Sequence, residues 1–199
     1  MDDKKFNLLD EPWICVMKEN GEVKELSLMD VLLHAHQYRR LAGELPTQDV
    51  AVLRLLLAVL QTVVYRYDTD GNEDELVETE DAYERWKEIW NDGKLPDKPI
   101  QEYLTKWKAR FYLYDSDRPF YQVPKAAIGT ECKAAKLNGE ISESSNKLRL
   151  FSNRAGKEKE FLSNSEAARW LLYLNGYDDT SAKPKEKGLP SPGTGCRWK

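Results

Sequence analysis

An apolar segment between residues 48 and 66 constrains the fold more than any other feature of the sequence. Thr47 precedes the segment and is of a type that caps helices, so we predict a helix from Gln48 to about Arg66. Five apolar residues recur at helical spacing and three more widen their stripe: Val50, Leu53, Leu57, Leu60 and Val64, flanked by Leu55, Leu56 and Val59. A helix that is apolar on nearly all sides is expected to be the buried centre of the core.

The same segment is not expected to cross a membrane, because its strongest run, Val50 to Val64, is shorter than a bilayer span and contains Arg54. The first thirteen residues contain no apolar run of the kind that a secretory signal needs. The three cysteines stand far apart and form no CxxC pair, which favours free thiols in a reducing compartment. The sequence therefore predicts a soluble, cytoplasmic protein with no membrane partner.

Turn and capping signals around this segment predict an α+β fold that is mostly helical, with short strands or hairpins and long loops. Asn20-Gly21 predicts a hairpin turn that leads into a return strand at Val23–Leu26. Ser27 is placed to cap the next helix, and Ser163 with Glu166 forms a capping box for the last one. Four helices are predicted besides the apolar one: Leu28 to about Arg40, a helix capped by Thr79 and running through Trp90, Ile100 to about Arg110, and Asn164–Asn175 with Gly176 as its C-terminal cap.

Charge is distributed unevenly along the chain, although the formal total is only -4. Residues 147–199 contain eleven Lys/Arg against six Asp/Glu, whereas the preceding residues contain nineteen against twenty-eight. Only the C-terminal part is therefore suited to a polyanion such as nucleic acid.

Two loops in that part combine basic residues with residues that let the backbone approach a ligand. The first contains Asn153, Arg154, Lys157 and Lys159, and the second contains Lys183, Lys185, Lys187, Gly188, Gly193 and Gly195. Lysines at alternate positions of an extended chain can follow successive phosphates, and glycines permit close approach to a groove floor. A solvated charged loop is the alternative interpretation, and the residues alone leave both open.

Patterns that would indicate an enzyme or a metal site are weak. The acidic turn from Asp68 to Asp74 places its glycine at the fourth position of a calcium loop and Thr79 where a bidentate Glu is needed. His34 and His36 are two apart on a predicted helix and face different ways. No P-loop, G-x-S-x-G or G-x-G-x-x-G motif is present. We therefore predict no catalytic residue, no metal and no cofactor.

Two aromatic pairs stand at helical spacing, Trp86 with Trp90 and Tyr103 with Trp107. Exposed aromatic rings could stack on nucleic-acid bases. Aromatic residues at this spacing more often face the core of a helical protein, and we expect that here.

Four stretches, in order along the chain, resemble the large subunit of type I-E Cascade, the CasA family. They are FNLLDEPWI at residues 6–14, the leucine-rich helix after Leu45-Pro46-Thr47, RPFYQ at residues 118–122, and LNGY at residues 174–177 followed by a glycine-rich segment. The resemblance extends over nearly the whole chain.

This resemblance implies a non-catalytic, DNA-binding subunit of a CRISPR antiviral surveillance complex. Its implied partners are the other Cascade subunits, the CRISPR RNA, double-stranded target DNA and the helicase-nuclease that degrades the target. Base pairing with the RNA would read the target sequence, whereas the protein would read the short protospacer-adjacent motif, largely from the minor groove.

The resemblance also implies roles for the two loops. Residues 151 to about 161 are similar to a family loop that contacts the complex and the motif region, which implies docking by Phe151, Ser152 and Phe161 and DNA contacts by Asn153, Arg154, Lys157 and Lys159. Residues 188–195 are similar to the glycine-rich loop that approaches the minor groove, with Lys183, Lys185 and Lys187 serving the phosphates. Some family members carry a cysteine pair near the first loop, but residues 161–164 contain none.

Family members run to several hundred residues and end in a four-helix bundle. We therefore expect residues 1–199 to be a truncated N-terminal domain of the large subunit, with the C-terminal four-helix bundle absent. Two rival hypotheses remain. One is a protein-interaction scaffold that docks through residues 151–161 and the RPFYQ patch, and the other is an enzyme that uses the acidic turn with a divalent metal.

Overall fold

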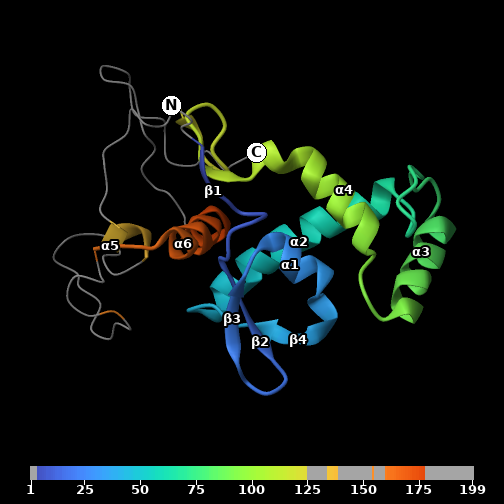
Figure 1. The fold of residues 1–199 in the computed structure, drawn as a ribbon, viewed down its shortest axis with the longest axis horizontal. Helices are drawn as coiled ribbons and strands as arrows, with labels where there is room; N and C mark the ends of the chain where they lie inside the picture. The colour runs from blue at the N-terminus through green and yellow to red at the C-terminus, as the bar shows by residue number, and fades with distance from the viewer. Residues whose placement is uncertain (1–3, 125–133, 139–153, 155–159, 178–199) are drawn as a thin grey trace.

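The computed structural model describes residues 4–124, 134–138, 154 and 160–177. Figure 1 shows α2 (Pro46–Arg66) in the middle of the molecule, with α6 (Asn164–Tyr177) beside it and α3 (Thr79–Asp92) at the far edge. The other helices are α1 (Leu28–Leu33), α4 (Asp97–Trp107) and the short α5 (Ala134–Leu137), with 3-10 turns at Ala35–Gln37 and Lys108–Arg110. Together with two small antiparallel sheets, these helices confirm the predicted α+β class.

The larger sheet has the strand order β3-β2-β4, with β2 at Ile14–Lys18, β3 at Val23–Leu26 and β4 at Tyr38–Leu41. The predicted hairpin is confirmed, since β2 and β3 pair across a turn in which Gly21 has φ of 84°. The smaller sheet joins β1 (Lys5–Asn7) to β5 (Tyr112–Tyr114) and so ties the N-terminus to the chain after α4.

The predicted helix from Leu28 to Arg40 is wrong in its second half. Ser27 caps α1 as expected, because its hydroxyl accepts the Asp30 N–H at 3.0 Å. The helix ends at Leu33, however, and Tyr38–Leu41 pairs with β2 as a third strand. Tertiary pairing with β2 thus overrides the local helical preference, which sequence spacing cannot reveal.

The apolar helix α2 is present as predicted, but it begins at Pro46 and Thr47 is not its cap. Two side chains of its first turn instead accept hydrogen bonds from the backbone that precedes the helix. Asp49 accepts the Gly43 N–H at 2.7 Å, and Gln48 accepts the Glu44 N–H at 3.1 Å. The face of α2 that packs into the core is Ala51, Val52, Leu55, Leu56, Val59 and Val63.

The predicted inward stripe of α2 is therefore wrong at three of its five positions, whereas Leu60 packs against the core as expected. Val50, Leu53 and Leu57 are each 44% exposed, and the residues expected only to flank them form the core contact. Because α2 is apolar on two faces, periodicity cannot choose between them, and the choice comes from the helices α4 and α6 that pack against one face.

Helices α3 and α4 also depart from expectation in part. Glu78 rather than Thr79 caps α3, through a reciprocal capping box with Asp81. The expected burial of Trp86 and Trp90 is wrong, because their side chains are 53% and 71% exposed. Helix α4 begins at Asp97, a turn earlier than predicted, and it places Leu104 in the core.

Helix α6 confirms the predicted capping box. Ser163 Oγ accepts the Glu166 N–H at 3.2 Å, and the Glu166 carboxylate accepts the Ser163 N–H at 2.7 Å. The helix continues through Gly176, which was expected to end it. Its buried Ala168 and Leu172 join the core that α2 shares with Trp13 and the larger sheet.

Candidate nucleic-acid interface

Two of the residues predicted to bind DNA or dock on the complex lie within the described part of the chain, namely Arg154 and Phe161. The others lie outside the described residues: Phe151, Ser152, Asn153, Lys157, Lys159, Lys183, Lys185, Lys187, Gly188, Gly193 and Gly195. Their predicted roles stay predictions.

Arg154 is held by two carboxylates of the protein itself. Its Nη2 donates to both oxygens of Glu44, at 2.8 and 2.9 Å, and to Oε1 of Glu166 at 2.7 Å. The indole N–H of Trp170 donates to the same Glu44 carboxylate at 3.0 Å. The Arg154 side chain is only 10% exposed. This cluster, the Arg154 clamp, ties residue 154 to the chain before α2 and to the first turn of α6.

Electrostatics in the Arg154 clamp favour the charged forms. Burial alone would raise the pKa of Glu166, but hydrogen bonds from Ser163 and the Arg154 guanidinium hold that pKa below its ordinary value. A phosphate would therefore have to compete with two carboxylates that already neutralise Arg154. Contact between Arg154 and DNA stays a prediction, and what the structure shows is an anchoring role.

A second ion pair fixes α6 on the side that also carries Glu166, since residues 166 and 169 are three apart on the helix. Arg169 is buried, and its Nη1 donates to the Trp13 carbonyl at 2.7 Å and to Glu25 Oε1 at 2.6 Å. Nearby, burial raises the pKa of the Cys15 thiol to about 11, and the Glu25 carboxylate adds to that rise while Arg169 opposes it. Helix α6 is thus attached by ionic contacts to the larger sheet as well as by apolar contacts to α2.

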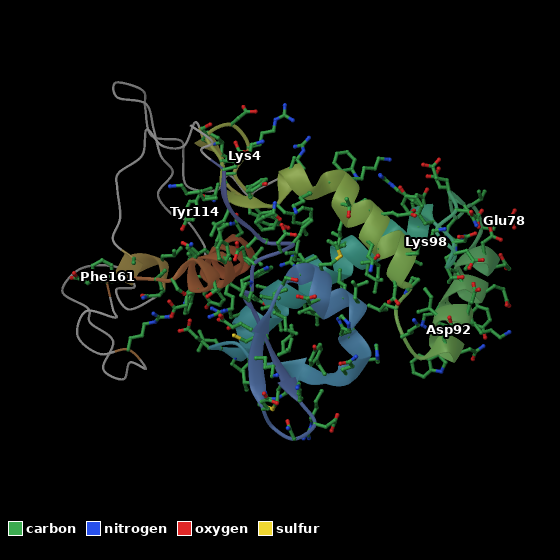
Figure 2. All side chains as sticks on the ribbon, viewed as in Figure 1. Lys4, Glu78, Asp92, Lys98, Tyr114 and Phe161 are labelled. Carbon is green, nitrogen blue, oxygen red and sulfur yellow. The ribbon has the colours of Figure 1, made fainter. Side chains whose placement is uncertain are left out.

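Phe161 is 69% exposed, so its ring is available to a partner. In Figure 2 it lies at the opposite end of the molecule from α3, whose two ends are marked by Glu78 and Asp92. The predicted docking role of Phe161 requires such exposure, and the role itself stays a prediction.

A basic and aromatic hollow of about 630 Å³ lies where the end of α2, the end of α4 and the turn after β5 meet. We call it the arginine hollow and define it by six lining residues: Arg66, Arg110, Arg118, Tyr103, Trp107 and Tyr121. Within the described part of the chain, Arg66 and Arg110 form no ion pair, and Arg118 pairs only with its exposed neighbour Asp117, at 3.1 Å.

The wall of the arginine hollow is built by the RPFYQ stretch. Phe120 is buried against Phe111, with ring centroids 5.7 Å apart, and Gln122 donates to the Leu113 carbonyl at 2.8 Å. Between them Tyr121 has φ of 54°, a left-handed conformation that costs a non-glycine residue about 1–2 kcal/mol. This conformation leaves the Tyr121 ring exposed while its neighbours are anchored.

Arginines beside exposed aromatic rings suit a ligand that has both an anionic group and a flat π face, as a nucleotide does. Sequence reasoning missed this site, because Arg66, Arg110 and Arg118 come from three separate elements. Only the RPFYQ stretch gave a signal, and it was interpreted as a patch for docking on partner subunits.

Comparison with known proteins gives a consistent result. The model of the family described as "CRISPR-associated protein Cse1" matches residues 7–197. A curated relative from Thermus thermophilus, "CRISPR-associated protein CasA/Cse1", is 33% identical over 169 residues, which are 85% of this chain and 31% of the relative. The chain thus spans about a third of that relative's length.

Solved structures show the same fold. Thermobifida fusca Cse1 superposes with a TM-score of 0.73 at 32% identity, over 97% of this chain and 35% of that chain. A chain of a structure titled "CRISPR RNA-guided surveillance complex" superposes with a TM-score of 0.68 at 21% identity, over 94% of this chain and 37% of that one. At that identity the second match shows the fold alone.

Proposed function

Because this chain belongs to the CRISPR-associated Cse1 (CasA) family, we propose that it is a non-catalytic subunit of an RNA-guided antiviral surveillance complex. In that role it binds double-stranded target DNA and recognises the protospacer-adjacent motif. The observation that carries this proposal is the family match over residues 7–197, which includes both basic loops. The chain corresponds to part of the N-terminal domain of the large subunit, and its partners are the other subunits, the CRISPR RNA and the helicase-nuclease.

The distribution of charge supports this function. A protein that reads a duplex needs cations that neutralise phosphates, and the excess of Lys/Arg is confined to residues 147–199. The arginine hollow adds three cations beside exposed rings at a site far from these residues in sequence. In this mechanism the guide RNA reads the target by base pairing, and the protein contributes motif recognition and backbone contacts.

The test is the salt dependence of duplex binding by the assembled complex, measured by fluorescence anisotropy. Replacing Lys183, Lys185 and Lys187 together by Ala is expected to weaken binding and to reduce the slope of log K against log salt by up to about 2.7, since each neutralised phosphate contributes about 0.9. A control variant removes three exposed lysines from α3, α4 and the turn between them: Lys87, Lys94 and Lys106. Equal slopes for the two variants would refute the role of the tail lysines.

The arginine hollow allows an independent test with described residues. Arg66→Ala with Arg110→Ala is expected to lower DNA affinity by about tenfold, which corresponds to two lost phosphate contacts of moderate strength. Arg39→Ala with Arg40→Ala, two exposed arginines on β4, is the matched control because it removes the same charge elsewhere. If both pairs weaken binding equally, the arginine hollow contributes only general electrostatic attraction to DNA and is not a specific contact site.

A protein-interaction scaffold without DNA binding of its own is the second candidate, and the exposed ring of Phe161 favours it. Phe161→Ala is then expected to prevent incorporation of the chain into the complex, as measured by co-purification with the other subunits. If incorporation fails and duplex binding by the separate chain is unchanged, this segment serves docking. Normal incorporation would exclude the docking role of Phe161.

A further inference from the structure

The arginine hollow contains aromatic rings that contact with duplex DNA would leave unused. The bases of a duplex are stacked inside it, so a protein beside the duplex meets phosphates and base edges rather than base faces. Arginines alone would satisfy that contact. Trp107 and Tyr121 nevertheless line the hollow with 37% and 52% of their surfaces exposed. Such rings suit the face of an unpaired base.

The Tyr121 ring is held at the surface by the residue before it and by its own backbone. Phe120 is buried, and its ring centroid lies 4.8 Å from that of Tyr121. The left-handed backbone of Tyr121 costs free energy, and its exposed ring recovers little of that cost by burial. Strained residues of this kind are concentrated at ligand-binding sites. The strain therefore favours a binding role for the ring.

The charge of the arginine hollow is positive and only partly neutralised. Its described lining contains three arginines against one carboxylate, that of Asp117, which leaves a local charge of +2 in a chain whose formal total is -4. Asp117 pairs with Arg118, whereas Arg66 and Arg110 form no ion pair in the described part of the chain. Two such guanidiniums favour an anionic ligand, and a phosphate monoester carries about −1.5 to −2 charges at neutral pH.

The size of the arginine hollow suits a small ligand. Its volume of about 630 Å³ is within the range of about 300–1,000 Å³ that small-molecule sites occupy. Buried Phe111 and Phe120 form part of its lining, so a base would find apolar surface beneath it as well as the exposed rings beside it. The hollow thus combines the surfaces that the two halves of a nucleotide need.

We propose that the arginine hollow binds one unpaired nucleotide, with the base stacked on Tyr121 and Trp107 and the phosphate bound by Arg66 and Arg110. A free nucleoside 5′-monophosphate and an unpaired nucleotide within a strand offer this same chemistry. The inference rests on the proposed function in taking the ligand from nucleic acid, and it adds that the ligand is a single nucleotide recognised by both its base and its phosphate.

The test is isothermal titration calorimetry of the 199-residue chain with 5′-AMP. We expect one site per chain. Adenosine lacks the phosphate and ribose 5-phosphate lacks the base, so each is expected to bind at least tenfold more weakly than 5′-AMP. Single-stranded tetradeoxyadenylate separates the two sources: binding at least tenfold tighter than that of 5′-AMP assigns the hollow to a strand, and equal or weaker binding assigns it to a free nucleotide.

Variants of Tyr121 test the stacking. Tyr121→Gly is expected to lower affinity for 5′-AMP about tenfold through the loss of base stacking. It is expected to fold as the parent chain does, because glycine adopts a φ of 54° freely. Tyr121→Phe keeps the ring and is expected to retain binding. Tyr83→Ala, which removes an exposed tyrosine from α3, is the matched control and is expected to leave binding unchanged.

Variants of the arginines test the phosphate contact. Arg66→Ala with Arg110→Ala is expected to weaken binding of 5′-AMP at least tenfold and to leave the weak binding of adenosine unchanged. Arg39→Ala with Arg40→Ala on β4 is expected to change neither. Because all four side chains are exposed, both double variants are expected to melt at the temperature of the parent chain.

Three results would overturn this inference: no binding of 5′-AMP at millimolar concentration, equal binding of 5′-AMP and ribose 5-phosphate, or equal binding of 5′-AMP by Tyr121→Gly and the parent chain. Duplex binding by the assembled complex, measured in parallel, separates this inference from the proposed function. If the complex binds the duplex and 5′-AMP does not bind the chain, only the nucleotide site is refuted. If 5′-AMP binds as expected and the complex does not bind the duplex, the nucleotide site stands and the proposed function is refuted.

Discussion

Arg154→Ala is expected to destabilise the protein by about 2 kcal/mol, although the sequence predicted a role for Arg154 in binding DNA. The Arg154 clamp contains three charge-assisted hydrogen bonds of 2.7–2.9 Å around a side chain that is 10% exposed. Breaking a fully buried pair costs about 3–5 kcal/mol, and an exposed pair contributes about 0–1 kcal/mol. The partly buried carboxylates of Glu44 and Glu166 place the Arg154 clamp between these limits.

Urea denaturation followed by circular dichroism measures this loss, and a thermal melt is expected to shift by about 4–8 °C in a chain of this size. Arg118→Ala is the control, because that guanidinium is 63% exposed and pairs only with its neighbour Asp117, so its loss is expected to be below about 0.5 kcal/mol. A double-mutant cycle between Arg154→Ala and Glu44→Ala is expected to give a coupling of about 1–2 kcal/mol. Equal stability of the Arg154 and Arg118 variants would refute the anchoring role.

Three further outcomes are expected. A carboxyl whose pKa is lowered by folding stabilises the native state above its unfolded pKa of about 4.3, so stability is expected to fall with pH below that value and to fall less in Glu166→Gln, as urea titrations at pH 3–7 would show. Cys15, with its pKa raised to about 11, is expected to react with iodoacetamide at pH 8 on the order of a hundredfold more slowly than an ordinary thiol, as peptide mass spectrometry would report. Gly43→Ala is expected to cost about 1–2 kcal/mol in thermal melts, because a Cβ there would lie 2.7 Å from Gln48 Oε1 and 2.8 Å from Asp49 Oδ1 and would disturb the start of α2.

Local signals in the sequence predicted local structure well. The Asn20-Gly21 turn, the Ser27 cap and the Ser163–Glu166 capping box all appear where expected, because each depends on hydrogen bonds between residues close in sequence. The apolar helix was also predicted correctly, because its composition is compatible with few other secondary structures.

Features that depend on distant partners were not predictable. The buried face of α2 was mispredicted at three positions, because two of its faces are apolar and the packing of α4 and α6 decides which one is buried. Tyr38–Leu41 became a strand because β2 offered it backbone partners. The arginine hollow joins residues from α2, from the 3-10 turn after α4 and from the turn after β5, and no spacing rule connects Arg66 with Arg110.

The most direct measurement of the proposed function is the affinity of a guide-loaded surveillance complex for a target duplex, with and without this chain. We predict that adding the chain strengthens binding at least tenfold when the protospacer-adjacent motif is present. The gain is expected to be much smaller on a duplex with the same target and a scrambled motif. Incorporation of the chain with no gain on either duplex would contradict DNA recognition and leave only a scaffolding role.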